Sequence, residues 1–126
     1  MMKRSLISVL SLLMLVLCIP ALAESTDWNY DANYAILRGY DGAGGDVVVP
    51  AEIDGFTVDV IGINVFKGDT ITSLTLPETV LELRSNAVSS CENLASVTLP
   101  QSLVVINRMN FFSCNALSEV TIPASV

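Results

Sequence analysis

Residues 77–122 decide the fold, because they contain one sequence pattern twice: PETVLELRSNAVSSCENLASVTL over residues 77–99 and PQSLVVINRMNFFSCNALSEVTI over residues 100–122. Each copy is 23 residues long, and the two align without a gap. Apolar and proline positions recur in register, as in the pairs Pro77/Pro100, Val80/Leu103, Leu83/Ile106, Cys91/Cys114, Leu94/Leu117 and Leu99/Ile122. A period in the range of roughly 20 to 50 residues is typical of solenoids, whose units bury their apolar faces only by stacking.

The repeat extends in both directions from this pair. An earlier, less regular copy ends at Pro77, and Pro50 lies 27 residues before it. The extra length falls around Ile53-Asp54-Gly55, which predicts a turn between two short strands. Pro123 begins a further copy, so we assign residues 47–126 to leucine-rich repeats, the last one incomplete.

Each copy ends in a short alternating segment before its proline. Alternation with a period of two predicts a strand with one buried face, and proline closes it because it cannot donate to a central ladder. The predicted outward positions are Ser73, Thr75, Ser96, Thr98, Glu119 and Thr121, between inward Leu74, Leu76, Val97, Leu99, Val120 and Ile122. The remainder of each copy has apolar residues three to four apart, which suits a helical turn or an irregular arc. The fold class is thus a β-rich solenoid of short parallel strands in 23-residue coils.

Aromatic residues cluster before the repeats. Trp28–Tyr30 and Tyr34–Tyr40 predict two short strands around a turn at Asp31-Ala32-Asn33. The first repeat would otherwise expose an apolar end and a free strand edge. We therefore assign residues 24–46 to an N-terminal β cap.

The first 23 residues have the pattern of a secretory signal peptide. Lys3 and Arg4 precede an apolar stretch from Leu6 to Ile19, and Ala21-Leu22-Ala23 forms a small-x-small cleavage site. The apolar stretch falls short of the roughly 20 residues that span a bilayer, so we expect cleavage after Ala23 and no stable membrane span. The alternative is a lipoprotein anchor on Cys18, although Leu17 stands where a small residue is usual.

Charge and cysteine content limit the classes of partner. Residues 24–126 carry four basic and thirteen acidic residues, a formal charge of −9. This excess disfavours nucleic acid and anionic membranes, which require clustered Lys and Arg, and it favours solubility. Two cysteines remain after residue 23, too few for a small disulfide scaffold, and the length suits one domain.

The sequence offers little to catalysis or metal binding. It contains no histidine, which excludes His-dependent triads, Cys-His dyads and His-containing metal sites. Cys91 and Cys114 occupy matched repeat positions and are expected to stack in the core as small apolar side chains, with a disulfide as the alternative. Asp41–Asp46, rich in glycine, resembles one copy of a calcium loop but is more simply a flexible turn. We predict no enzyme activity, no cofactor and no metal.

The repeat unit, Pro-x-x-Val-x-x-Leu-x-x-x-Ala-Val-x-x-Cys-x-x-Leu-x-x-Val-Thr-Leu, resembles the BspA-like leucine-rich repeat family of bacterial surface proteins, and the resemblance covers residues 28–126. It implies a secreted or cell-surface location, a curved solenoid, adhesion to host proteins, cells or extracellular matrix, and no catalytic residue. The chain departs from the family pattern at Arg84 and Asn107, where glycine is usual, at Asn110, where alanine is usual, and at Val88, where phenylalanine is usual.

We therefore expect an exported protein that mediates adhesion or protein-protein recognition through one solenoid face. The six outward strand positions are the candidate ligand-binding face, because solenoids bind along extended faces, although sheet propensity alone also explains threonine there. The alternative function is a structural spacer, or a truncated repeat module of a larger surface protein. The repeat pattern stops within a copy, so we also expect either a longer natural chain or end-to-end self-association through the last repeat.

Overall fold

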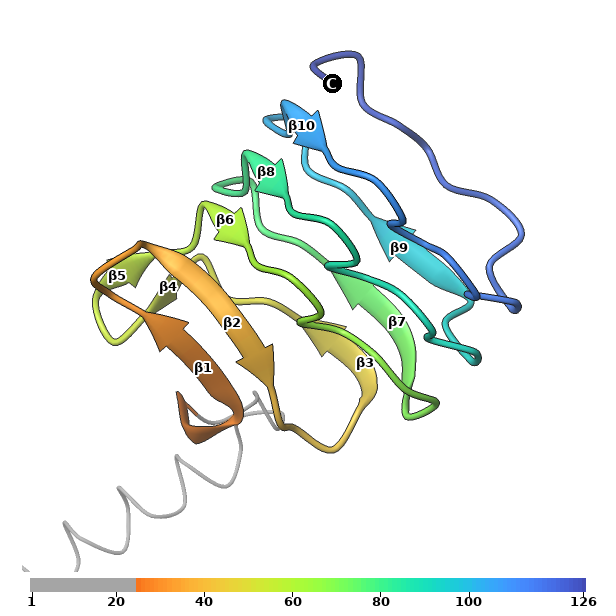
Figure 1. Ribbon diagram of the computed structural model, residues 1–126, viewed down its shortest axis with the longest axis horizontal. Helices are drawn as coiled ribbons and strands as arrows, with labels where there is room; N and C mark the ends of the chain where they lie inside the picture. Colours follow the sequence, from red (N-terminus) through yellow and green to blue (C-terminus); the bar gives the residue numbers. More distant parts are fainter. Residues whose placement is uncertain (1–24) are drawn as a thin grey trace, which may run out of the picture.

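A computed structural model describes residues 25–126, which wind into a short solenoid (Figure 1). The signal peptide, its cleavage site and Cys18 lie outside these residues. Within them the regular helical structure is one short 3₁₀ turn, η1 (Ser25–Asp27), and the other named elements are strands. The expectation of a β-rich solenoid is confirmed.

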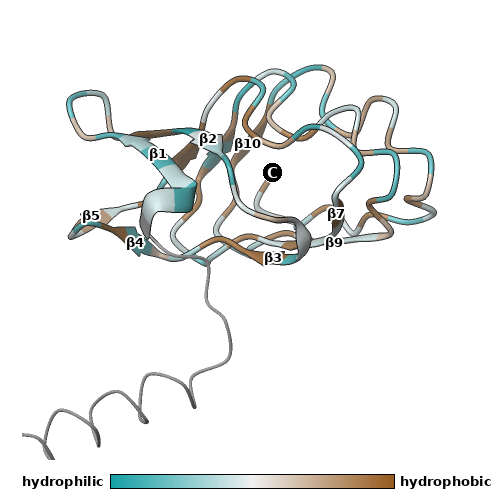
Figure 2. Ribbon diagram, turned by 90° about the horizontal axis from the view of Figure 1, so that it is seen from below, coloured by the Kyte–Doolittle hydropathy of each residue, from teal (hydrophilic) through white to brown (hydrophobic). Residues whose placement is uncertain are grey.

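Ten short strands form two walls and one small hairpin. The five-stranded sheet has the order β1-β2-β6-β8-β10, the three-stranded sheet has the order β3-β7-β9, and β4 pairs with β5 alone. The two larger sheets lie on opposite sides of the core (Figure 2). The strand bounds are β1 Trp28–Asp31, β2 Ile36–Tyr40, β3 Gly45–Val48, β4 Glu52–Ile53, β5 Phe56–Thr57, β6 Val60–Ile61, β7 Ile71–Thr75, β8 Glu82–Leu83, β9 Ser96–Thr98 and β10 Val105–Ile106.

In the three-stranded wall, β7 and β9 are the segments that alternation predicted. Strand β3 pairs with β7 and β7 pairs with β9, in both cases in parallel. Leu74 and Leu76 are buried, and Thr75 between them faces outward. Pro77 and Pro100 follow closely after β7 and β9, so proline does limit these strands as expected.

A third strand over residues 119–122 was also predicted, and the structure corrects this. No strand is described there, and Ile122, which the alternation placed inside, is 52% exposed. The physical reason is that strand propensity acts mainly through the packing and burial of side chains. Ile122 occupies a core position, but the described residues provide no further coil to bury it.

In the other wall, β6, β8 and β10 are two-residue strands that local sequence did not indicate. Strands β6, β8 and β10 pair in parallel, which places Ile61, Leu83 and Ile106 at equivalent positions of successive coils. Strand β2 joins this wall through Leu37 opposite Ile61. The arcs that follow are irregular and contain left-handed residues, so of the two expectations for these segments the irregular arc is the observed one.

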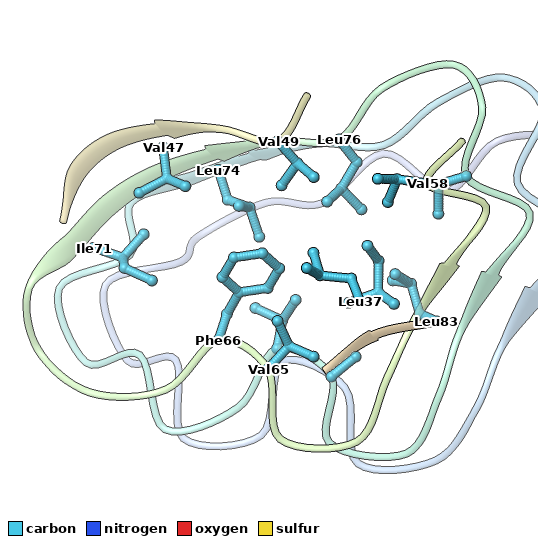
Figure 3. Packing of buried hydrophobic residues seen from close by; sticks show 14 of the residues in the cluster. Leu37, Val47, Val49, Val58, Val65, Phe66, Ile71, Leu74, Leu76 and Leu83 are labelled. Atoms are coloured by element: carbon cyan, nitrogen blue, oxygen red, sulfur yellow. The ribbon is translucent and has the colours of Figure 1, made fainter. Parts of the chain in front are cut away.

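The core is a stack of aliphatic columns with one phenylalanine near its centre. Figure 3 shows Phe66 between side chains of the two walls, with Leu74 on one side and Leu37 and Val65 on the other. Phe66 is 1% exposed, and Leu37, Leu83 and Leu103 are fully buried. Each coil contributes residues to this shared core, which is why a single 23-residue unit has no core of its own.

The N-terminal segment forms an antiparallel hairpin, β1 and β2, beside the first coil. Trp28 packs against Tyr40 and Phe66, with ring centroids 4.7 Å and 6.4 Å apart respectively. The turn predicted at Asp54-Gly55 connects β4 and β5, and both residues have positive φ, 51° and 84°. Such paired left-handed residues are typical of two-residue hairpin turns.

Asn110 connects the irregular arc that follows β8 with the arc that follows β10. Its side-chain carbonyl accepts a hydrogen bond from the Val88 N–H at 3.1 Å, and its amide donates to the carbonyls of Arg84 and Asn107 at 3.0 Å and 2.9 Å. Between the arcs that follow β6 and β8, Phe66 and Val88 pair in parallel through their backbones. The arcs that follow β8 and β10 also share backbone hydrogen bonds, such as that from the Phe111 N–H to the Val88 carbonyl, but there the Val88 N–H donates to the Asn110 side chain.

Candidate recognition face

The outer side of the β3–β7–β9 sheet, hereafter the recognition face, carries two parallel columns of side chains. Strand register places Asp46 beside Ser73 and Ser73 beside Ser96. The second column runs through Val48, Thr75 and Thr98 in the same way. Adjacent strands in a sheet lie about 4.8 Å apart, so each column presents side chains at a regular repeat distance.

The inner columns of the same strands hold the face in place. Val47 and Leu74 pair in register and are 3% and 1% exposed, and Val97 continues that column partly buried. Leu76 and Leu99 are buried in the next column. Because alternate side chains of a strand point to opposite sides, burial of these residues directs the hydroxyl side chains to solvent.

Hydrogen bonding on the recognition face is sparse. The Ser73 hydroxyl donates to Asp46 Oδ1 at 2.7 Å. Within residues 25–126, the hydroxyls of Thr75, Ser96 and Thr98 form no hydrogen bond to another residue. These three hydroxyls can therefore donate to, and accept from, a ligand without breaking internal bonds.

The strands of this face include one acidic residue, Asp46, and no lysine or arginine. Positive charge lies elsewhere: Arg38 is on β2 and pairs with Asp31 at 2.7 Å, and Arg84 comes within 3.9 Å of Glu82. The Arg38 guanidinium and local backbone N–H groups hold the pKa of Asp31 below its usual value. The recognition face is accordingly polar with a slight negative bias.

Four of the six predicted face residues come together. Ser73, Thr75, Ser96 and Thr98 are in register on β7 and β9. Glu119 and Thr121 are exposed but belong to no strand in the described structure. Among the described residues, 118–122 form no backbone hydrogen bond with β9, so the two columns are ordered over three strands and not four.

Sequence reasoning missed Asp46 and Val48 as members of the face. The signal was present, since GDVVVP ends at Pro50 as ITSLTLP ends at Pro77. It also missed an exposed apolar strip on the opposite wall: Leu81, Val104 and Val105 are 46%, 53% and 42% exposed. The Leu81 carbonyl accepts hydrogen bonds from the N–H groups of both valines, so the three residues adjoin.

The two cysteines are buried neighbours. Both are free thiols, 0% and 7% exposed, and each donates weakly to a backbone carbonyl. Burial, together with the adjacent Cys114, raises the pKa of Cys91 to about 11. A thiol with so high a pKa is a poor nucleophile near neutral pH, which agrees with the expected packing role.

The glycine-rich segment 41–46 has a structural explanation. Gly44 adopts φ +87°, and a Cβ there would lie 2.5 Å from the Thr70 carbonyl oxygen. The loop therefore needs glycine to approach the start of β7. Within residues 25–126, no group of three or more metal-ligating side chains is present.

Repeat geometry, parallel ladders and a shared aliphatic core define the class of leucine-rich-repeat solenoids. Residues 52–126 match the family described as the BspA type leucine rich repeat region, which comprises six copies of the repeat. The chain belongs to this family. Repeat proteins of this kind are usually surface or protein-interaction modules, and their solenoids are typically non-enzymatic binding scaffolds.

Two solved bacterial structures resemble the chain. A leucine-rich repeat protein from Bacteroides capillosus superposes with a TM-score of 0.68 at 34% identity, over 79% of this chain and 78% of that one. A leucine-rich repeat protein from T. pallidum gives a TM-score of 0.69 at 28% identity over 76% of this chain. The match spans 46% of the T. pallidum protein, so this chain covers about half of its length.

No curated protein shows significant similarity to the chain. Across residues 25–126, none of the helical structure is long and apolar enough to cross a membrane.

Proposed function

We propose that this chain is an exported bacterial surface or secreted protein that mediates adhesion by recognising a protein or extracellular-matrix ligand on its recognition face. Family membership supports the protein-interaction part of the proposal. The pattern of residues 1–23 supports export, with residues 24–46 as the N-terminal cap and residues 47–126 as the repeats.

The observation that carries the proposal is the in-register pairing of Ser73 with Ser96 and of Thr75 with Thr98. Two rows of hydroxyl side chains on a rigid parallel sheet form an extended, regular surface. Asp46 and Val48 lengthen the rows on one side, and we propose that Glu119 and Thr121 lengthen them on the other. A surface of this kind suits an extended polypeptide, which offers polar groups at a similar repeat distance.

The first experiment measures binding to a laminin-rich basement-membrane extract on a biosensor surface. The test variant is Thr75→Arg/Thr98→Arg, which blocks the centre of the threonine column with bulk and charge. The matched control is Asn33→Arg/Thr57→Arg, which adds the same charge at exposed positions of the β1–β2 turn and of β5. We expect at least about tenfold weaker binding for the test variant, equivalent to about 1.4 kcal/mol, and unchanged binding for the control.

The outcomes separate the alternatives. An equal loss of binding in both variants would mean that binding to the extract depends on net charge and not on the recognition face. Equal binding of both variants and the unaltered chain would place the ligand site elsewhere. Absence of binding by the unaltered chain to the extract, and to intact host cells, would remove adhesion and leave the structural-spacer interpretation.

Export has a separate test. Mass spectrometry of the protein produced in a bacterial host is expected to show an N-terminus at Glu24 after cleavage behind Ala23. A lipid-modified N-terminus at Cys18 would instead establish the lipoprotein anchor.

A further inference from the structure

The short turns that lead into β6, β8 and β10 form one long side of the solenoid, hereafter the turn edge. Figure 1 shows these turns and the β4–β5 hairpin along one side and the longer arcs along the other. Backbone hydrogen bonds join neighbouring turns, because the Leu81 N–H donates to the Asp59 carbonyl at 2.8 Å and the Val104 N–H donates to the Leu81 carbonyl at 2.9 Å. The turn edge consists of residues 50–60, 77–82 and 100–105.

Large apolar side chains are exposed on the turn edge. Leu81 is 46% exposed, although hydrogen-bonded turns lie on both sides of it. Its side chain therefore faces outward from the coil, and its exposure does not depend on the number of coils. Val104 has the same position in the next coil and is 53% exposed, and Phe56 on β5 is 48% exposed. Apolar side chains that gather at outward positions favour contact with another molecule.

An aromatic pair lies at the first coil of the turn edge. Phe56 stacks on Tyr30, with ring centroids 6.0 Å apart and 20° between the ring planes. The Tyr30 hydroxyl donates to the Thr57 carbonyl at 2.9 Å, which fixes the position of the ring. Desolvation raises the pKa of Tyr30, and the carboxylates of Asp59 and Asp31 raise it further, so the pair lies in a negative field. Aromatic rings attract cations, and this part of the edge therefore suits a Lys or Arg side chain.

Charge is separated between the two long sides of the solenoid. The turn edge contains no lysine or arginine and five acidic residues: Glu52, Asp54, Asp59, Glu78 and Glu82. The arcs on the other side are residues 62–70, 84–95 and 107–118, which contain three basic and two acidic residues, a formal charge of +1. The turn edge thus carries −5 of the formal charge of −9 on residues 24–126. Its field attracts cationic partners.

Most of these carboxylates lack a basic neighbour. Among the described residues, Glu82 alone of the five lies near a guanidinium, 3.9 Å from Arg84 Nε. In the same part of the chain, Asp59 Oδ1 is buried and accepts no hydrogen bond. Burial of such an oxygen is costly, and a cation close to the carboxylate offsets part of that cost. The charge of the turn edge therefore selects the sign of its partner.

We propose that the turn edge binds a cationic, amphipathic segment of a partner protein. Basic side chains of the segment lie against Asp59 and the Tyr30–Phe56 pair, and its aliphatic side chains cover Leu81 and Val104. Complementary charge steers the segment to this side of the solenoid, and the apolar contacts hold it there. The site is separate from the recognition face, because β3, β7 and β9 form a different side of the solenoid.

The test measures binding of labelled peptides to the purified full chain by fluorescence anisotropy at physiological salt. The first peptide has three repeats of Lys-Lys-Val-Val, which place both kinds of side chain on each side of an extended chain. Repeats of Lys-Lys-Ser-Ser keep the charge without the aliphatic groups, and repeats of Glu-Glu-Val-Val reverse the charge. We expect the Lys-Lys-Ser-Ser peptide to bind at least about tenfold more weakly than the first peptide, and the Glu-Glu-Val-Val peptide not to bind.

Two charge variants locate the site. Glu52→Gln/Asp54→Asn removes two charges from the turn edge, and asparagine tolerates the left-handed conformation at position 54, where φ is 51°. This variant is expected to bind the first peptide about tenfold more weakly. Asp69→Asn/Glu92→Gln is the matched control, because it removes two exposed charges from the arcs on the other side. Its binding is expected to be unchanged.

Leu81→Ser tests the apolar part of the turn edge. It is expected to weaken binding of the first peptide about fivefold, because aliphatic surface is no longer buried in the complex. Ile63→Ser is the matched control, since Ile63 is 58% exposed on an arc of the other side, and its binding is expected to be unchanged. The comparison among the three peptides needs no substitution, so it tests the proposal even where a variant misfolds.

Several results would overturn the proposal. One is absence of binding by the first peptide, and another is equal binding of the Lys-Lys-Val-Val and Lys-Lys-Ser-Ser peptides. An equal loss in the two charge variants would mean that net charge alone attracts the peptide. Self-association that both Glu52→Gln/Asp54→Asn and Arg108→Gln abolish, in a chain that binds no peptide, would make the basic arcs of a second copy the occupant instead.

Discussion

Gly62 offers a sharp test of how the N-terminal hairpin meets the first coil. The Gly62 N–H donates to the Leu37 carbonyl at 2.8 Å, and a Cβ on residue 62 would lie 2.7 Å from that same oxygen and 3.0 Å from Ile36 Cγ2. The oxygen belongs to the backbone, so it moves only if β2 moves. Arg84 and Asn107 occupy the equivalent position of later coils, where the hairpin is absent. We therefore predict that Gly62→Ala destabilises the protein.

Gly39→Ala is the matched control. Gly39 lies on β2, the strand that Gly62 contacts, and has no positive φ. A Cβ on residue 39 would lie 3.5 Å from Asn29 Cβ, an ordinary contact. Both substitutions reduce the entropy of the unfolded chain, a gain of about 0.4–1 kcal/mol that cancels in the difference between them. The remaining difference is the cost of overpacking at residue 62, about 1–3 kcal/mol.

The assay is thermal unfolding of the two variants at one protein concentration, with guanidinium denaturation as a check on the free energy of unfolding. A domain of about 100 residues loses about 4–8 °C in Tm for each 1 kcal/mol, so we expect Gly62→Ala to melt at least about 5 °C below Gly39→Ala. Equal melting temperatures would refute the reasoning, because they would show that β2 yields to the methyl group at no cost.

Further predictions concern the arcs and the buried thiol. Asn110→Ala leaves the buried Val88 N–H without its partner and is expected to lower the free energy of unfolding by about 2–3 kcal/mol. The control Asn93→Ala removes one exposed hydrogen bond and should cost about 1 kcal/mol or less. If Asn110→Ala were as stable as the unaltered protein, the arc after β10 would have to pair with Val88 through its backbone. Leu83→Ala empties a fully buried position and should cost about 2–5 kcal/mol in denaturant titrations, and a loss below 1 kcal/mol would contradict the shared core. Burial raises the pKa of Cys91 from 9.0 to about 11, so its neutral thiol contributes fully to stability below pH 9, and this contribution falls as pH rises through 11. Between pH 8 and pH 11, Cys91→Ala should therefore lose less stability than the unaltered protein in denaturant titrations. Parallel pH profiles of the two proteins would exclude the effect.

Much of the fold follows from local pattern. The 23-residue period, the prolines and the alternation of Leu74 and Leu76 with polar residues predicted strands β7 and β9 and their parallel register. The aromatic segments from Trp28 to Tyr40 predicted a hairpin, and Asp54-Gly55 predicted a turn. These features depend on short-range preferences and on spacing, both of which are visible in a single sequence.

Other features depend on neighbours in space. Strands β6, β8 and β10 are two residues long, too short for any periodicity, and exist because the same position of each coil meets its counterpart. The segment at residues 119–122 has the sequence of a strand and yet forms none in the described structure, where no further coil covers its outer side and Ile122 is 52% exposed.

The candidate site divides in the same way. The sequence by itself determined that Ser73, Thr75, Ser96 and Thr98 face outward, because alternation along a strand fixes which side each residue takes. Only the tertiary structure decided that Asp46 and Val48 join their columns and that Glu119 and Thr121 lie outside the ordered sheet. The physical reason is that the direction of a side chain is a local property of the backbone, whereas the extent of a surface depends on which coils stack and pair.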